Sequence, residues 1–187
     1  MSRIFIELPT WLGDGVMATP AIENLLKIYP DAQLTVFGSF VSTALFKHHP
    51  NIEQLIIDDS KQSGNRLINL YKTSRSLGRF DVALSFRSSF ASKWLLFCMS
   101  AQKKAVYHRI GDTDSHQVIR YNDFINHTLG QDLQPADLTL FAKPNAQPST
   151  QYSKQRPLLG LNPGSTYGSA KRWYPNEFAQ VAIALSQ

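Results

Sequence analysis

Short apolar runs alternate along the chain with longer segments in which apolar residues recur every three to four positions. The short runs predict strands at residues 3–8, 33–38, 54–57, 82–86 and 105–108. The periodic segments predict helices at residues 16–28, 40–47, 65–77, 89–99 and 115–129. Strands that alternate with helices are typical of a parallel sheet covered on both faces. We therefore predict a Rossmann-like, doubly wound α/β domain.

The composition changes near residues 142–155, where Lys, Pro, Asn, Gln, Ser and Thr replace apolar residues. Such a stretch predicts a linker, and we place one domain at 1–150 and a second segment at 151–187. The second segment contains one predicted strand at 157–161, a loop, and one helix at 176–186. One strand and one helix cannot bury both of their faces. We expect this segment to be the start of a truncated second domain, and the chain to be a fragment.

The composition narrows the class of protein. Hydrophobic residues make up 43% of the 187 residues and charged residues 18%, which is ordinary for a soluble globular protein. The net charge of +5 favours anionic partners such as phosphates or an anionic membrane. The chain has neither a long basic run nor an RNA-binding aromatic motif, so nucleic acid is not an expected partner. The single cysteine, Cys98, cannot form an internal disulfide, and we expect a cytoplasmic protein.

Residues 161–175, LNPGSTYGSAKRWYP, form the most informative stretch. A predicted strand precedes this stretch and a predicted helix follows it. Its glycines and hydroxyl groups let the backbone approach a ligand, and a helix start offers unpaired N–H donors. Lys171 and Arg172 add two positive charges at the same place. The pattern indicates a loop that holds a phosphate.

Asp14 is the first candidate for catalysis. It lies in the turn after the first predicted strand, at the carboxyl edge of the sheet, where open α/β folds bind ligands. Gly13 and Gly15 flank it, and glycines there remove side-chain bulk and permit positive φ, so that a substrate can reach the carboxylate. A carboxylate in this position could act as a general base. It could also cap a helix that begins at Val16.

The same turn also matches the dinucleotide-binding pattern G-x-G-x-x-A at residues 13–18. That pattern requires an acidic residue at the end of the second strand to hold a ribose hydroxyl. Here the second strand ends in Phe37, Gly38 and Ser39, without a carboxylate. The glycines favour an NAD(P)-dependent oxidoreductase and the missing carboxylate disfavours it, so it is kept as an alternative. A binding module without catalytic activity is another.

The segments at 8–21 and 161–175 together resemble the ADP-heptose:lipopolysaccharide heptosyltransferases, most closely those of the heptosyltransferase II type. The resemblance covers essentially the whole chain. It implies a GT-B enzyme, in which two Rossmann-like domains face each other across the active site. The implied reaction is the inverting transfer of L-glycero-D-manno-heptose from ADP-heptose to the heptose of the lipopolysaccharide inner core. We expect residues 1–187 alone to be nearly inactive.

The resemblance also implies roles for individual residues, with Asp14 as the catalytic base. The implied donor-binding residues are Ser165, Thr166, Gly168, Ser169 and Lys171. The implied acceptor-binding residues are Gly13, Gly15, Arg87, Ser88, Ser89, Lys93, His116 and Arg120. Ordinary helix capping explains Ser88 or Ser89 equally well.

Asp112, Thr113 and Asp114 form a D-x-D triplet, which binds a metal–nucleotide complex in other glycosyltransferases. Turn formation and capping explain the triplet adequately. The resemblance implies that cations of the protein replace the metal, so we expect no metal and no cofactor. The implied partners are the nucleotide-sugar donor, the lipopolysaccharide core acceptor and, peripherally, the cytoplasmic face of the anionic inner membrane.

Overall fold

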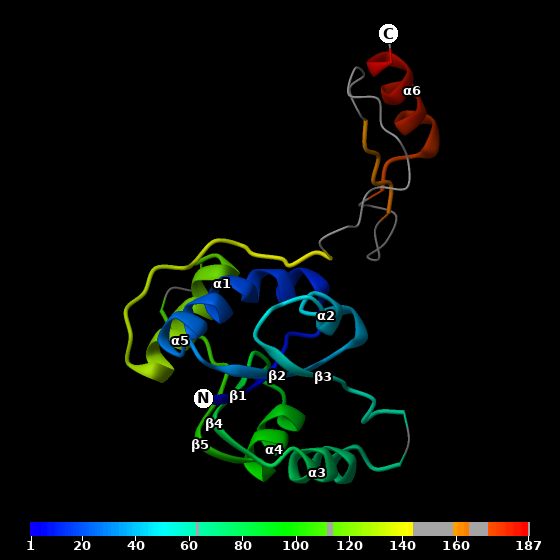
Figure 1. Ribbon diagram of the computed structural model, residues 1–187. Coiled ribbons are helices and arrows are strands. Elements are labelled where there is room, and N and C mark those ends of the chain that lie inside the picture. Colours follow the sequence, from blue (N-terminus) through cyan, green and yellow to red (C-terminus); the bar gives the residue numbers. More distant parts are fainter. Residues whose placement is uncertain (63, 112–113, 144–158, 165–171, 187) are drawn as a thin grey trace. The chain divides into compact units, whose positions relative to one another are not determined.

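The computed structural model describes residues 1–62, 64–111, 114–143, 159–164 and 172–186 (Figure 1). The chain divides into two compact units, Met1–Pro144 and Asn145–Gln187. In the described part of the second unit, helix α6 spans Pro175–Leu185. The strand predicted at 157–161 begins outside the described residues, and residues 159–161 are not in a strand.

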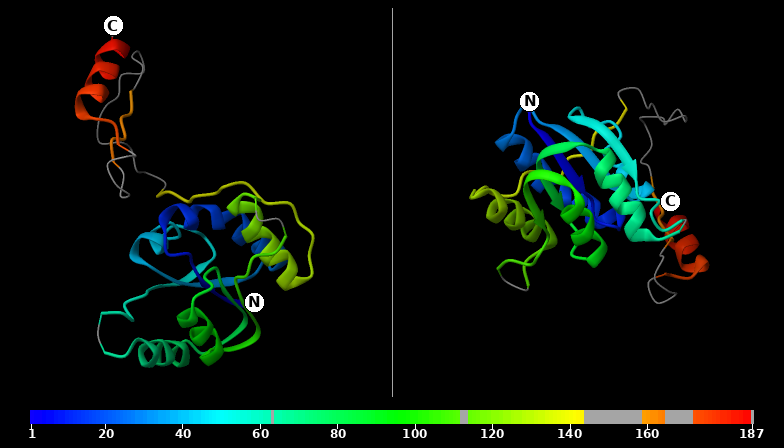
Figure 2. Two further views of the ribbon diagram at one scale, coloured as in Figure 1. Left: turned by 180° about the vertical axis from the view of Figure 1, so that it is seen from behind. Right: turned by 90° about the horizontal axis from the view of Figure 1, so that it is seen from below.

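The first unit is built on a five-stranded parallel sheet with the order β3-β2-β1-β4-β5. Helices α1, α2 and α5 cover one face of this sheet, and α3 and α4 cover the other (Figures 1 and 2). This arrangement confirms the predicted doubly wound α/β fold. The strands are β1 (Arg3–Glu7), β2 (Gln33–Gly38), β3 (Ile52–Ile57), β4 (Arg79–Ser85) and β5 (Ser100–Val106). The helices are α1 (Leu12–Ile28), α2 (Phe40–Ala44), α3 (Arg66–Ser76), α4 (Phe90–Cys98) and α5 (Gln117–Leu129).

Several predicted boundaries are wrong, and two errors are instructive. β5 begins at Ser100, five residues before the predicted start at 105. It is an edge strand whose exposed positions include Lys103 and Lys104, so it lacks the apolar run that identifies a covered strand. α1 begins at Leu12 and not at Val16, which places Gly13 and Asp14 inside the helix.

The central strand β1 has two different faces. Ile4 and Ile6 pack into the core beneath α1 and α5, while Phe5 packs into the core beneath α3 and α4. Glu7 follows Phe5 on the second face because side chains alternate along a strand. Glu7 pairs in register with Ser85 at the end of β4. A charged residue therefore lies at the buried centre of the sheet's carboxyl edge.

The strand order reverses direction at β1. The chain builds β2 and β3 outward on one side of β1 and then crosses to β4 on the other side. The loops that follow β1 and β4 therefore leave the sheet toward opposite faces and open a crevice between them. Open α/β sheets bind ligands in such crevices, outside the carboxyl ends of the strands.

Candidate functional site

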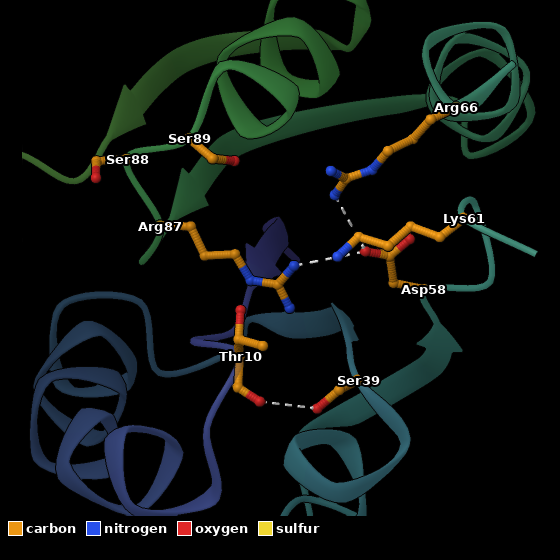
Figure 3. A pocket seen from close by; sticks show the side chains of 8 residues that line it. All are labelled: Thr10, Ser39, Asp58, Lys61, Arg66, Arg87, Ser88 and Ser89. Carbon is orange, nitrogen blue, oxygen red and sulfur yellow. Dashed lines mark hydrogen bonds and ion pairs between the residues drawn. The ribbon is translucent and has the colours of Figure 1, made fainter.

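A pocket of about 400 Å³ opens at this carboxyl edge (Figure 3). Its lining comes from the segments that follow four neighbouring strands, β1 to β4. The residues that line it are Thr10, Ser39, Asp58, Lys61, Arg66, Arg87, Ser88 and Ser89. The pocket contains Arg87, Ser88 and Ser89, three of the residues that the resemblance assigned to the acceptor.

Arg87 is the central cation of this pocket, and its side chain is only 12% exposed. Its Nε donates a hydrogen bond to the carbonyl oxygen of Leu8 at 2.6 Å. Its Nη1 lies 3.4 Å from Glu7 Oε1 and 3.5 Å from Asp58 Oδ2. Its Nη2 is buried and makes no hydrogen bond within the described part of the chain. One donor atom of this held guanidinium thus has no hydrogen-bond partner among the described residues.

Glu7 lies beneath the pocket and supports Arg87. Its carboxylate accepts hydrogen bonds from Ser85 Oγ at 2.6 Å and from Ser92 Oγ at 3.1 Å. Burial raises the pKa of the Glu7 carboxyl above its ordinary value of 4.5, although the Ser85 hydrogen bond and the charge of Arg87 act in the opposite direction. Glu7 therefore connects β1, β4 and α4 at the base of the pocket.

The charges around the pocket favour an anion. Lys61, Arg66 and Arg87 converge on Asp58, as Figure 3 shows. Asp58 Oδ2 is 3.8 Å from Arg66 Nη2, and Asp58 Oδ1 accepts a hydrogen bond from Ser60 Oγ at 2.5 Å. Asp58 and the buried Glu7 offset part of the charge of the three cations. The balance leaves the pocket suited to a phosphate or a carboxylate.

The two serines after β4 have different surroundings. Ser89 is the N-cap of α4, where its Oγ accepts a hydrogen bond from the N–H of Ser92 at 3.2 Å. The capping interpretation is therefore confirmed for Ser89, which also lines the pocket. Ser88 is exposed at the pocket wall. Ser39 caps α2 in the same way as Ser89 caps α4, by accepting from the N–H of Ser42 at 3.2 Å.

Asp14 lies in the first turn of α1, on the other side of β1 from Glu7's network, and its side chain is partly exposed. The N-cap of α1 is Trp11, so the interpretation of Asp14 as the cap residue is wrong. A carboxylate in a first helical turn interacts favourably with the helix dipole. On α5, burial raises the pKa of the Tyr121 hydroxyl, and the negative charge of Asp14 adds to this effect.

Neither Gly13 nor Gly15 uses the positive φ that glycine permits, because both are helical residues of α1. Gly15 is buried, and a Cβ there would come within 2.9 Å of Leu45 Cδ1. Gly15 thus allows α1 to pack closely against the segment after α2. Gly13 is exposed, and a Cβ there would meet no atom of the described chain within 4 Å. Of the two glycines, only Gly13 leaves open space beside Asp14.

Three further residues assigned to the acceptor do not line the pocket. Lys93 is exposed in the first turn of α4. His116 caps α5, where its Nδ1 accepts a hydrogen bond from the N–H of Val118 at 3.3 Å. Arg120 is partly buried on α5. The structure therefore groups Arg87, Ser88 and Ser89 and leaves Lys93, His116 and Arg120 apart from them.

The assigned donor-binding residues Ser165, Thr166, Gly168, Ser169 and Lys171 lie outside the described residues. Next to them along the chain, Trp173 packs edge-on against Phe178 of α6, with ring centroids 5.6 Å apart. Both rings line a hollow within the second unit. Trp173 therefore has a packing partner in this unit.

Comparison with protein families assigns the chain to a family. The model of glycosyltransferase family 9, the heptosyltransferases, matches residues 70–187. The chain belongs to this family. It is 40% identical over 185 residues to lipooligosaccharide heptosyltransferase 2 of Campylobacter jejuni, covering 99% of this chain and 57% of that protein. It is 23% identical to lipopolysaccharide heptosyltransferase 2 of Escherichia coli, covering 98% of this chain and 60% of that protein.

Solved structures share the fold of this family 9 chain. A family 9 glycosyltransferase from Veillonella parvula superimposes with a TM-score of 0.83 at 22% identity, covering 98% of this chain and 60% of that one. The E. coli ADP-heptose lipopolysaccharide heptosyltransferase II superimposes with a TM-score of 0.71 at 22% identity, covering 98% and 61%. The fold is thus the N-terminal part of the GT-B architecture that the resemblance implied, and the oxidoreductase alternative has no support. The chain spans about three fifths of the length of these relatives.

Several site residues of this family 9 chain escaped prediction from the sequence: Glu7, Thr10, Ser39, Asp58, Lys61 and Arg66. Glu7 carried a usable signal, because a charged residue in a strand covered on both faces is rare unless it is paired. Asp58 follows a predicted strand directly, which also marks the carboxyl edge of the sheet. Their meeting with Arg87 depends on the strand order, which the sequence pattern alone does not provide.

Two features are absent from the described residues: a cluster of metal ligands and a helix able to cross a membrane. Among these residues, no group of three or more His, Cys, Asp and Glu side chains is placed to hold a metal ion. The D-x-D triplet falls partly outside it, and Asp114 is exposed. None of the described helices is long and apolar enough to cross a membrane.

Proposed function

We propose that the whole protein is an inverting glycosyltransferase that transfers L-glycero-D-manno-heptose from ADP-heptose to the heptose of the lipopolysaccharide inner core. Membership of the heptosyltransferase family supports the type of reaction. One observation supports an acceptor site in this unit: the buried Nη2 of Arg87 has no partner among the described residues. Arg87 lies in a cationic pocket at the carboxyl edge of the sheet, where the strand order reverses at β1. A phosphorylated or carboxylated glycolipid provides the matching negative charge.

Asp14 acts as the general base in this proposal. Its carboxylate takes the proton of the acceptor hydroxyl while the acceptor oxygen bonds to the anomeric carbon of the heptose. The bond between that carbon and the β-phosphate oxygen of ADP-heptose breaks at the same time, and ADP leaves with the electron pair. The exposed edge at Gly13 leaves space for the acceptor beside Asp14. Base catalysis of this kind contributes about 10²–10⁴-fold.

Arg87, Ser88 and Ser89 hold an anionic group of the acceptor in the pocket. The guanidinium is fixed by Leu8, Glu7 and Asp58, so little conformational entropy is lost when an anion binds. Gly13 lies at the acceptor's path to Asp14. Lys93, His116 and Arg120 are proposed to contact more distant parts of a large acceptor, since they lie outside the pocket.

Lys171, with Ser165, Thr166, Gly168 and Ser169, binds the diphosphate and ribose of the donor. A lysine there stabilises the charge that develops on departing ADP, which is the role that a metal ion has in other glycosyltransferases. We therefore propose that transfer needs neither a metal nor another cofactor. We also propose that the second unit begins the donor-binding domain and that residues 1–187 alone turn over poorly.

The acceptor is a lipid, and its core is assembled at the inner membrane in this proposal. The protein would therefore act in the cytoplasm and contact the inner membrane peripherally. The positive charge of the pocket and of the chain supports attraction to that anionic surface. Nucleic acid is not a proposed partner.

ADP release by the whole protein tests the proposal. We expect release that requires both ADP-heptose and an acceptor carrying one heptose, and that persists in EDTA. An acceptor without heptose serves as the control for substrate choice. Release that stops in EDTA and returns with magnesium would contradict the metal-free reaction. If the protein transfers heptose to neither acceptor, the heptosyltransferase assignment is contradicted.

A further inference from the structure

An apolar hollow of about 300 Å³ lies between α2 and the edge strand β3, separate from the polar pocket. Its wall contains the side chains of Phe40, Ala44, Leu55 and Ile57, together with Thr43 and Lys47. Phe40 is 69% exposed and Ile57 is 48% exposed. Exposed apolar groups gathered at one place mark a contact surface more often than isolated ones do.

The hollow adjoins the polar pocket at two points. Phe40 of the hollow directly follows Ser39 of the pocket, and Asp58 of the pocket directly follows Ile57 of the hollow. Consecutive Cα atoms lie about 3.8 Å apart, so the pocket and the hollow lie close together along α2 and β3. Taken together they form a surface that is polar and cationic at one end and apolar at the other.

The cations of this surface are arranged for an amphiphilic partner. Lys61 and Arg66 line the polar end, and Lys47 lines the apolar end. A lysine can lay its methylene groups along apolar surface and still present its ammonium group to a phosphate. Aromatic and basic side chains side by side are typical of proteins that bind at the interface of an anionic bilayer.

We propose that this surface, which we call the α2–β3 face and define by Phe40, Lys47, Leu55 and Ile57, docks on an anionic lipid bilayer. The inference deepens the proposed function and rests on it in one respect: a lipid acceptor in the polar pocket would bring the adjoining α2–β3 face to the membrane. Phe40 and Ile57 contact the acyl region, and Lys47 contacts lipid phosphates. The polar pocket then remains open to the acceptor's sugar.

Vesicle binding by the full chain tests the α2–β3 face. We compare vesicles of phosphatidylcholine with vesicles that also contain phosphatidylglycerol, by co-sedimentation. We expect the parent chain to bind the mixed vesicles. Phe40→Ser should lower the affinity roughly tenfold, because one large apolar side chain no longer enters the bilayer. Lys47→Gln should lower it roughly fivefold, because one positive charge near the lipid phosphates is lost. Equal binding of Phe40→Ser and the parent chain would overturn the proposal, and so would equal binding to both kinds of vesicle.

Phe97→Ser is the matched control, because Phe97 is a 75% exposed phenylalanine on α4, on the other face of the sheet. We expect it to leave vesicle binding unchanged, and circular dichroism confirms that each variant is folded. A concentration-dependent dimer of the chain that Phe40→Ser abolishes, without any vesicle binding, would overturn the proposal in favour of a second copy on this face.

A transfer assay separates this inference from the proposed function. In the whole protein, Phe40→Ser should keep its turnover with a deacylated, water-soluble acceptor and lose turnover with the same acceptor embedded in vesicles. Equal loss with both acceptors would overturn the membrane role of Phe40. If the parent protein transfers heptose to neither acceptor, the proposed function fails, while vesicle binding still decides whether the α2–β3 face binds lipid.

Discussion

Two carboxylates lie near the carboxyl end of β1, seven positions apart, and their surroundings differ completely. The Glu7 side chain is 3% exposed and interacts with two serine hydroxyls and a guanidinium. Asp14 lies on the opposite side of the strand, partly exposed in the first turn of α1. A buried, fully engaged carboxylate holds other groups in place, whereas a partly exposed one can meet a substrate. The same side-chain chemistry therefore supports two different roles.

Asp14→Asn tests the reactive half of this comparison and should have the largest effect. We expect turnover of the whole protein to fall by about 10²–10⁴-fold, because the amide cannot take the acceptor proton. Stability should fall by no more than about 1 kcal/mol, the typical contribution of a charge in a first helical turn. The measurement is acceptor-dependent ADP release, with urea denaturation alongside. Unchanged release would return Asp14 to a purely helical role.

Arg87→Met tests how much the buried carboxylate of Glu7 depends on its cationic partner. The substitution leaves Glu7 and Asp58 without the guanidinium between them, and we expect a loss of about 3–5 kcal/mol of unfolding free energy in urea denaturation. The matched control is Arg3→Met, because Arg3 Nε also lies 3.4 Å from a carboxylate, that of Glu53, but both side chains are at least 40% exposed. That surface pair should contribute less than about 1 kcal/mol. Arg3→Met also removes an exposed hydrogen bond from Nη1 to the carbonyl oxygen of Arg79 and a contact over the Phe80 ring, but its total loss should stay well below that of Arg87→Met. Equal losses for the two substitutions would show that burial does not distinguish the pairs.

Glu7→Gln sharpens the comparison through its pH dependence. The raised pKa of Glu7 means that the folded state binds this proton more tightly than the unfolded state does. The contribution of Glu7 to stability is therefore full below the unfolded-state value of 4.5 and is lost as the pH rises through the folded-state pKa. Urea denaturation at several pH values should show this decline for the parent chain and a flatter profile for Glu7→Gln.

The amide at position 7 can still bond to Ser85 and Ser92, so Glu7→Gln should fold normally. Glu23→Gln serves as its control, since Glu23 is hydrogen-bonded to His49 on the other face of the sheet. It tests whether the loss of any carboxylate of this domain flattens the profile. If Glu7→Gln leaves the decline in place, another group causes it.

Gly13→Ala and Gly15→Ala should have the smallest effects. Alanine at position 13 meets no described atom, so the helix should gain roughly 0.5–1 kcal/mol of stability. Alanine at position 15 must displace the end of Leu45, which offsets that gain. Gly13→Ala with normal stability and reduced turnover would show that the acceptor passes close to this position, whereas normal turnover would exclude that close approach.

The alternation of strands and helices was sufficient to predict the class of fold, because a covered parallel strand must be apolar along its whole length. β5 departs from this rule at the sheet edge, and its start was mispredicted for that reason. Asp14 and Arg87 became candidates through local signals, a turn or helix start directly after a strand. Glu7 also carried a local signal, its charge within a covered strand, but Lys61 carried none. Which residues Glu7 and Lys61 meet depends on which strands become neighbours.

The sequence by itself determined the doubly wound α/β architecture, the family, and the candidate role of Asp14, since each depends on residues close together along the chain. Only the tertiary structure decided that Glu7, Asp58 and Arg87 meet. Glu7 is the last residue of β1, whereas Asp58 and Arg87 follow β3 and β4, and the strand order brings the carboxyl ends of these strands to one edge of the sheet. It also decided that the polar pocket adjoins the apolar hollow at α2 and β3. Contacts between distant segments arise from packing, and no local pattern of residues encodes them.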